Sequence, residues 1–160
     1  MKFYVLAIGH RMPGWVAAGF EDYVRRMPPE MPIILREIRP EPRHAPSLSL
    51  AALQRIVRAE AGRLAMAQPS GSVLVALDER GKPYRTAQFA EAIGSWRNEG
   101  HDVAFAIGGA DGLDEAFKRS AQLMLSLSPM TLPHQLVRVM LAEQIYRAVS
   151  ILNKHPYHRA

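Results

Sequence analysis

The stretch Leu125-Ser-Leu-Ser-Pro-Met-Thr-Leu-Pro-His-Gln-Leu136 leads into a long apolar helix, and the other features of the chain are understood from it. We expect this helix to run from Pro133 to about Leu152, because a proline at the first helical position loses nothing by its fixed φ and missing N–H. The loop before the helix is rich in large apolar side chains, which gain no burial free energy when exposed. The loop is therefore expected to be packed, with its backbone N–H and C=O groups bonded to neighbouring residues or to a ligand.

Length and composition limit the class of protein. A chain of 160 residues fits one domain, here residues 1–160, with a sizeable core. It contains no cysteine, so disulfides, thiolate metal sites and a cysteine nucleophile are excluded. The apolar run at residues 3–8 is too short to span a membrane, and no signal pattern is present. We therefore expect a cytoplasmic protein with no membrane partner.

The charge of the chain favours an anionic partner. Lys and Arg number 20 against 15 Asp and Glu, which gives a net charge of +5 at pH 7. Guanidinium groups pair bidentately with phosphate, so an arginine-rich surface suits phosphate or nucleic-acid partners. Taken alone the charge is a weak signal, because many basic proteins bind no nucleic acid.

Apolar runs alternate with amphipathic segments, which is typical of an α/β fold with a mostly parallel sheet sandwiched by helices. Strands are expected at residues 3–8, 33–38, 72–77, 102–107 and 123–126. Helices are expected from Pro13 onward, after a cap at Ser47 or Ser49, at residues 87–98 after a cap at Thr86, and at residues 114–119. Residues 79–83 are expected to form a turn.

Three loops follow predicted strand ends, after Leu77, Ile107 and Ser126, and ligands of open parallel sheets bind at such ends. Gly108-Gly109 either lets the backbone approach a ligand closely or makes a tight turn, and both interpretations stay open. The stretch Gly108-Gly-Ala-Asp-Gly112 lacks the G-x-G-x-x-G spacing, which disfavours a dinucleotide-dependent oxidoreductase.

The last helix, the tail and a proline-rich stretch each allow two interpretations. Apolar residues cover more of the helix than one packing partner needs, so it is either buried on several sides or shared with a second protomer, and we favour the second. The tail His155-Pro-Tyr-His-Arg159 is either an ordinary polar terminus or an RNA contact, while a metal site lacking cysteine or a nearby carboxylate is disfavoured. The stretch from Arg39 to Pro46 is either a mobile arm or a basic contact loop.

Motifs along the whole chain resemble one protein family. They are Ile107-Gly-Gly-Ala-Asp-Gly-Leu113, Leu125-Ser-Leu-Ser-Pro-Met-Thr-Leu-Pro-His134, Val137-Arg-Val139, Glu143-Gln-Ile-Tyr-Arg147 and His155-Pro-Tyr-His-Arg159. Together they closely resemble the ribosomal RNA large-subunit methyltransferase H family of the SPOUT, or α/β-knot, methyltransferases. The resemblance implies a homodimer with a C-terminal trefoil knot that binds S-adenosyl-L-methionine. It also implies methylation of N3 of a pseudouridine in 23S rRNA on the assembled ribosome.

The resemblance also assigns residues to the site. The implied cofactor pocket consists of Leu77, Gly108, Leu127, Ser128, Pro129, Met130, Thr131 and Leu132. We hypothesise that His134, Tyr157, His158 and Arg159 surround the target base, while Arg138 holds a phosphate or the base anion. No metal is required, because the methyl group of a sulfonium is already electrophilic. The rival from another class is a non-catalytic basic module that binds RNA or the ribosome and has no affinity for S-adenosylmethionine.

Overall fold

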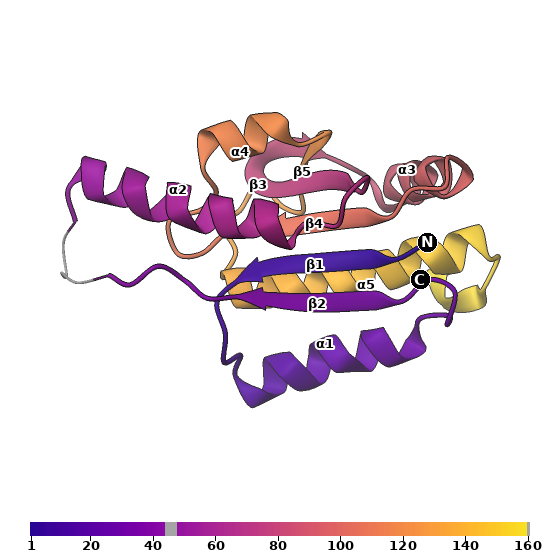
Figure 1. The fold of residues 1–160 in the computed structure, drawn as a ribbon. Coiled ribbons are helices and arrows are strands. Elements are labelled where there is room, and N and C mark those ends of the chain that lie inside the picture. The colour runs from indigo at the N-terminus through magenta and orange to yellow at the C-terminus, as the bar shows by residue number, and fades with distance from the viewer. Residues whose placement is uncertain (44–47, 160) are drawn as a thin grey trace.

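Five parallel strands form one sheet in the computed structural model, which describes residues 1–43 and 48–159, with the side chains of residues 158 and 159 outside the description (Figure 1). The strand order is β2-β1-β4-β3-β5. The strands are β1 (Phe3–Ile8), β2 (Ile33–Ile38), β3 (Val73–Pro83), β4 (Val103–Ile107) and β5 (Leu123–Ser126). Every pairing between these strands is parallel, which confirms the predicted α/β class. The trefoil knot stays a prediction.

The helices lie in two layers, one on each face of the sheet (Figure 1). One layer holds α1 (Gly14–Arg26), α3 (Thr86–Asn98) and α5 (His134–Leu152), and the other holds α2 (Leu50–Ala67) and α4 (Glu115–Ser120). A short 3-10 helix, η1 (Pro156–Arg159), follows α5. Among the described residues, no helix combines the length and the apolar character needed to cross a membrane.

Successive side chains of β1 point to opposite faces of the sheet and pack into the two hydrophobic cores on either side of it. Val5 packs into the core under α1, α3 and α5, whereas Leu6 packs into the core under α2 and α4. All six residues of β1 are buried, which explains why a strand covered on both faces has a continuous apolar sequence.

The predicted turn at residues 79–83 is wrong, because β3 continues to Pro83. After Leu77 the pairing with β5 shifts, and Lys82 then pairs with Leu125, so the residues between bulge out of the ladder. Gly81 makes this possible. A Cβ built on Gly81 would lie 2.7–2.8 Å from backbone atoms of Met124 and Leu125. Glycine therefore serves a close approach of two strands here.

The starts of three helices can be compared with the sequence predictions. One selects between two predicted caps, and the other two differ from the prediction. The Ser49 side chain accepts the Ala52 N–H at 3.2 Å, so Ser49 is the cap of α2, and Ser47 lies outside the described residues. The expected cap at Thr86 is wrong, because Thr86 is the first residue of α3 and its hydroxyl bonds the Gln144 amide oxygen on α5 at 3.1 Å. Gln88 Oε1 accepts the Arg85 N–H instead. Pro133 precedes α5 and does not begin it.

The contact at Gly81 predicts a stability difference between two alanine variants. Gly81→Ala should lower the free energy of unfolding by roughly 2 kcal/mol or more, because its methyl group would overlap backbone atoms that cannot yield easily. Gly62→Ala is the control, since Gly62 lies inside α2 with open space around it and should gain about 0.5–1 kcal/mol. Urea denaturation of both variants measures the difference. Equal stability would contradict the close approach of β3 to β5.

Candidate active site

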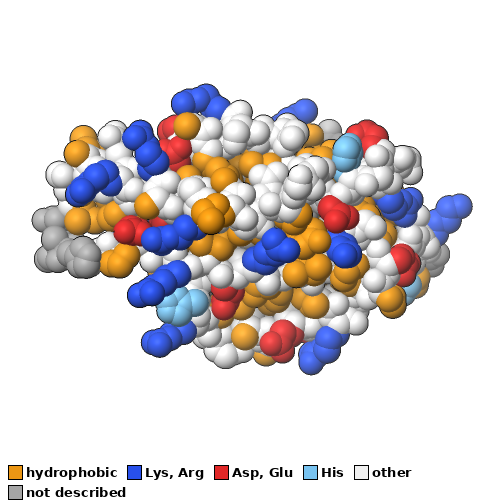
Figure 2. All heavy atoms as spheres, in the orientation of Figure 1, with side chains coloured by type: hydrophobic (Ala, Val, Ile, Leu, Met, Phe, Trp, Pro, Cys, Tyr) orange, Lys and Arg blue, Asp and Glu red, His pale blue; other side chains and the backbone are white. Residues whose placement is uncertain are grey.

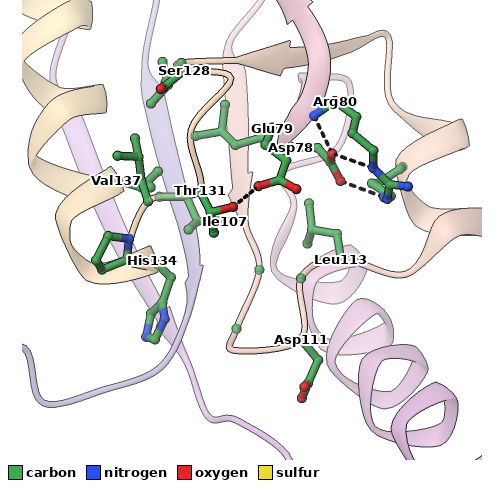
Figure 3. Close-up of a pocket in the computed structure, with 18 of the residues that line it drawn as sticks. Asp78, Glu79, Arg80, Ile107, Asp111, Leu113, Ser128, Thr131, His134 and Val137 are labelled. Atoms are coloured by element: carbon green, nitrogen blue, oxygen red, sulfur yellow. Dashed lines mark hydrogen bonds and ion pairs between the residues drawn. The ribbon is translucent and has the colours of Figure 1, made fainter. Parts of the chain in front are cut away.

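A cavity of about 790 Å³ opens at the carboxyl ends of β3, β4 and β5 (Figure 3). Residues 77–80 of β3, the loop after β4 and the loop between β5 and α5 line most of it, and residues of α4 and of the first turn of α5 complete the lining. The volume falls within the range of about 300–1,000 Å³ that is usual for small-molecule sites. The three loops that the sequence placed at strand ends therefore meet around one space.

Most of the residues expected to hold a cofactor line this cavity. They are Leu77, Gly108, Leu127, Ser128, Met130, Thr131 and Leu132. Pro129 belongs to the same loop but is not a lining residue. Contact of these residues with a cofactor stays a prediction.

The loop of residues 108–112, called the glycine loop below, is folded tightly on itself. The Gly112 N–H donates to the Gly109 carbonyl at 3.1 Å, and Gly112 has φ +76. A Cβ built on Gly108 would lie only 2.5 Å from the Gly112 carbonyl carbon. The two open interpretations of Gly108-Gly109 are thus compatible, because this tight turn also exposes backbone to the cavity.

Five of the six residues in the loop 127–132 line the cavity. Within the described part of the chain, these residues make no backbone-to-backbone hydrogen bond. Side chains hold the loop instead, since Ser126 Oγ donates to the Ser128 carbonyl at 2.9 Å and Ser128 Oγ accepts the Met130 N–H at 2.9 Å. The Thr131 hydroxyl donates to the Glu79 carboxylate at 2.5 Å, which joins this loop to β3 (Figure 3). The loop is therefore ordered, with backbone groups available to a ligand.

One side of the cavity is charged. The Lys118 ammonium of α4 is buried and lies 2.7 Å from carboxylate oxygens of both Asp78 and Glu115. Burial alone would raise the pKa of Asp78, but the hydrogen bonds from Lys118 and from the Arg80 N–H, together with both cations, lower it. Burial would likewise lower the pKa of Lys118, but the two carboxylates raise it. Both partners are therefore ionised at neutral pH.

His134 stands at the first turn of α5, across the cavity from Asp78 and Arg80 (Figure 3). Burial, followed by the nearby charges of Arg138 and Arg43, lowers the pKa of the imidazole. A neutral imidazole at pH 7 retains one nitrogen lone pair that can accept a proton. The loop after β1 lies close by, because a Cβ built on Gly9 (φ +107) would be 3.7 Å from His134 Nε2.

The structure places Arg138 differently from the expectation. Its side chain is 1% exposed and donates to the Glu37 carboxylate at 2.8 Å and to the Gly9 carbonyl at 2.8 Å. The guanidinium thus joins the ends of β1 and β2 to α5. A group bound and buried in this way cannot reach an RNA phosphate without leaving those partners.

The Tyr157 side chain of the tail does not reach His134 within one chain. The Tyr157 hydroxyl lies 3.2 Å from the Glu143 carboxylate, and its ring packs on Tyr146 and under the Arg147 guanidinium. Burial, with Tyr23 and Glu143 adding to it, raises the pKa of Tyr157 to about 12. Glu143 follows His134 by nine residues, which is about 14 Å along a helix axis. The side chains of His158 and Arg159 lie outside the description.

The sequence did not reveal the charged side of the cavity. Asp78 is recognisable as the residue after a predicted strand, but the pattern of residues 79–83 predicts a turn. The signal that could have found this side is the run Asp78-Glu-Arg80 at a strand end, followed in the chain by Glu115 and Lys118, three residues apart on one helix face.

Comparison with known proteins confirms the resemblance seen in the sequence. Residues 1–158 match the family described as "Predicted SPOUT methyltransferase". Proteins named "Ribosomal RNA large subunit methyltransferase H" from Burkholderia vietnamiensis and Burkholderia multivorans are 54% and 53% identical to this chain. Each alignment spans 160 residues and covers 100% of both proteins.

The buried ion pair of the cavity predicts a pH-dependent loss of stability. Lys118→Met should lower the free energy of unfolding at pH 7 by roughly 2–3 kcal/mol, because it leaves the Asp78 carboxylate buried with only Arg80 beside it. The pKa of Asp78 is lowered in the folded protein. The ion pair therefore stabilises the fold fully at a pH above the ordinary carboxyl pKa, and this stabilisation is lost as the pH falls through the lowered pKa. Urea denaturation should therefore show that the difference in free energy of unfolding between Lys118→Met and the wild-type protein becomes smaller at acidic pH. Arg80→Met, an exposed partner, should change little.

Proposed function

This chain belongs to the SPOUT methyltransferase family, and we propose that it uses S-adenosylmethionine to methylate N3 of a pseudouridine in the 23S rRNA of the assembled ribosome. The observation that carries the proposal is the cavity at the ends of three strands, lined by the glycine loop and by residues 127–132. A substrate of this kind places the activity in the cytoplasm.

Three features of the cavity fit S-adenosylmethionine. The backbone groups of residues 127–132 that lack backbone partners can pair with the polar edge of an adenine. Apolar side chains such as Leu77 and Leu113 can cover the flat faces of the ring. Four carboxylates line the cavity against two cations, and this excess suits a ligand that carries a sulfonium and an ammonium. The carboxylates are those of Asp78, Glu79, Asp111 and Glu115, and the cations are Arg80 and Lys118.

The residues of the chain have two tasks in this reaction. When bound, the cofactor supplies a methyl group that is electrophilic without further activation. The protein must hold the uracil-type ring in line with that methyl group and remove the proton from N3. His134 is suited to accept the proton, because its lowered pKa keeps the imidazole neutral at pH 7. Arg138 acts as a positioning residue that fixes the first turns of α5 against Gly9.

Tyr157 can join His134 only if a second protomer supplies it, and we propose that His158 and Arg159 come with it. In one chain Tyr157 lies on Glu143, nine residues after His134. If two α5 helices pair antiparallel and cross near Val139 and Met140, the partner's Tyr157 comes to the first turns of α5. We therefore infer a homodimer in which the tail of each protomer completes the pocket of the other.

The surface for this dimer is the one that α1 and α5 share. A shallow groove of about 240 Å³ there is lined by Tyr23, Val139, Met140, Glu143 and Gln144. Trp15 lies two helical turns before Tyr23 on the same stripe of α1 and is 66% exposed. A groove of mainly apolar character beside an exposed tryptophan suits a second protein surface better than water.

RNA is proposed to enter over the loops that follow β1 and β2. His10, Arg11 and Arg39 are exposed there, next to His134, because Ile8 pairs with Ile38 at the strand ends. Arg11 holds a left-handed backbone (φ 66), which costs about 1 kcal/mol or more and is typical of functional loops. Figure 2 shows Lys or Arg side chains gathered around a histidine on this part of the surface. These cations can contact the phosphates that flank the target base.

The first test measures methyl transfer in a mixture of two inactive variants. Deletion of residues 155–160 and His134→Ala should each reduce methyl transfer to ribosomes at least about a hundredfold, because each removes part of the base site. The deletion should leave S-adenosylmethionine binding, measured by calorimetry, nearly unchanged. Co-expressed together, the two variants should recover roughly a quarter of wild-type activity, since roughly half of the dimers are mixed and each mixed dimer has one complete site of two.

The outcomes of this mixing experiment separate the alternatives. No recovery in a mixture that forms mixed dimers would show that the tail serves its own pocket. Normal activity of the deletion variant would remove the tail from the mechanism. A wild-type protein with no affinity for S-adenosylmethionine would favour the non-catalytic RNA-binding module. Radiolabelled transfer to intact ribosomes, separate subunits and naked rRNA identifies the substrate.

The proposed RNA surface predicts a substrate-specific defect. The double variant Arg11→Glu/Arg39→Glu should raise KM for ribosomes about tenfold at 0.15 M salt and flatten the salt dependence of KM, because it removes phosphate contacts. Neither kcat nor S-adenosylmethionine affinity should change. Arg25→Glu/Arg97→Glu is the control, with the same change of charge on exposed residues at the opposite end of the sheet. If both double variants raised KM equally, the effect would come from net charge, and the proposed RNA surface would be wrong.

A further inference from the structure

The described part of the proline-rich stretch, residues 39–43, is held firmly against α2. Arg63 of α2 donates to the Arg39 carbonyl at 2.8 Å and also pairs with the Glu41 carboxylate. The Glu41 N–H donates to the Glu60 carboxylate, also on α2, at 2.9 Å. Of the two interpretations of this stretch, a mobile arm does not describe residues 39–43.

Arg43 connects this stretch to the glycine loop. Its guanidinium donates to the Asp111 carboxylate through Nε at 3.0 Å and through a terminal nitrogen at 2.5 Å. Its other terminal nitrogen lies 3.7 Å from Glu60 Oε1. Arg43 therefore bridges a carboxylate of α2 and a carboxylate of the cavity lining.

Glu60 is the buried end of this chain of contacts. It is 2% exposed, and within the described residues its second oxygen, Oε2, is buried with no hydrogen-bond partner. That oxygen faces the glycine loop, because a Cβ built on Gly109 would lie 3.3 Å from it. Burial raises the pKa of Glu60, while the Glu41 N–H and the charges of Arg43 and Arg63 oppose the rise and that of Asp111 adds to it.

A carboxylate buried in this way costs free energy unless it is paired and hydrogen-bonded, and only one oxygen of Glu60 accepts a hydrogen bond among the described residues. Besides accepting the Glu41 N–H, Glu60 lies 3.7 Å from Arg43, which pairs with Asp111 of the glycine loop. Gly109 has no side chain with which to fill the space between Ile8 and Glu60. The glycine loop therefore lies directly against a buried carboxylate that is not part of the cavity lining.

We propose that Glu60 and Arg43 are positioning residues that hold Asp111, and through it the glycine loop, in the shape that binds S-adenosylmethionine. The ligand named here rests on the proposed function, whereas the control of the loop does not. The proline-rich stretch thereby gains a role, since residues 39–43 carry the arginine that joins α2 to the cavity.

The test uses Glu60→Gln, which keeps an oxygen for the Glu41 N–H and removes the charge facing Arg43. Amide hydrogen exchange at Gly112, whose N–H bonds Gly109 within the loop, should become about tenfold faster, as expected when one charge-assisted contact is lost. The Kd of S-adenosylmethionine should rise about tenfold by calorimetry, while kcat with saturating cofactor stays within about twofold. Glu91→Gln, an exposed change on α3, is the matched control and should change neither quantity.

A double-mutant cycle distinguishes positioning from general stability. If Glu60 acts through Arg43 on Asp111, then Glu60→Gln combined with Arg43→Met should accelerate exchange in the glycine loop no more than Arg43→Met alone. Additive effects, or unchanged exchange at Gly112 in Glu60→Gln, would overturn the proposal. Exchange that quickens equally in β1 and α2 would indicate a purely structural role and also overturn it. Absence of cofactor binding by the wild-type protein would refute the proposed function, and the exchange measurements would still decide the control of the loop.

Discussion

The architecture of the site depends on one close contact, the approach of Gly81 to the backbone of β5. Without a side chain at this position, β3 can leave its ladder after Leu77, bulge, and pair again with Leu125. The bulge brings Asp78, Glu79 and Arg80 to the same cavity as the loop that follows β5. β3 thereby supplies one apolar residue, Leu77, and three charged residues of the cavity lining. Glu79 and Arg80 therefore line the cavity from a part of β3 that the sequence pattern predicts as a turn.

The charged side chains around the cavity are held in place by partners on other elements. Lys118 of α4 neutralises Asp78 of β3, and Glu79 of β3 accepts a hydrogen bond from Thr131. Asp111 of the glycine loop is held by Arg43, which also faces Glu60 of α2. Such contacts join loops that make few backbone hydrogen bonds of their own. Fixed side-chain contacts are a means of keeping a site preorganised when its backbone must stay available to a ligand.

Sequence patterns predicted those features that depend on residues close together in the chain. The buried run of β1, the glycine turn after β4 and the apolar loop before α5 could all be recognised, because burial and turn geometry leave marks within a few residues. The bulge of β3 could not be, since Gly81 and Pro83 fit a turn equally well and only the nearness of Met124 decides between them. Glu60 and Arg138 escaped for a similar reason. A charged residue in a helix is normally read as exposed, and its burial becomes visible only when its partners 19 and 101 residues away are known.

The feature that local sequence patterns predict least is the different placement of the two ends of α5. The helix begins with His134 at the cavity and ends in a tail whose Tyr157 returns only as far as Glu143. A rigid helix cannot bring its two ends together, so in the proposed mechanism residues at both ends act on one base across a symmetry axis. The same helix carries a groove beside α1 and has no fully exposed residue between 134 and 152 even in the single chain. The proposed dimer, in which two protomers share α5, would explain both the excess of apolar surface on this helix and the position of its tail.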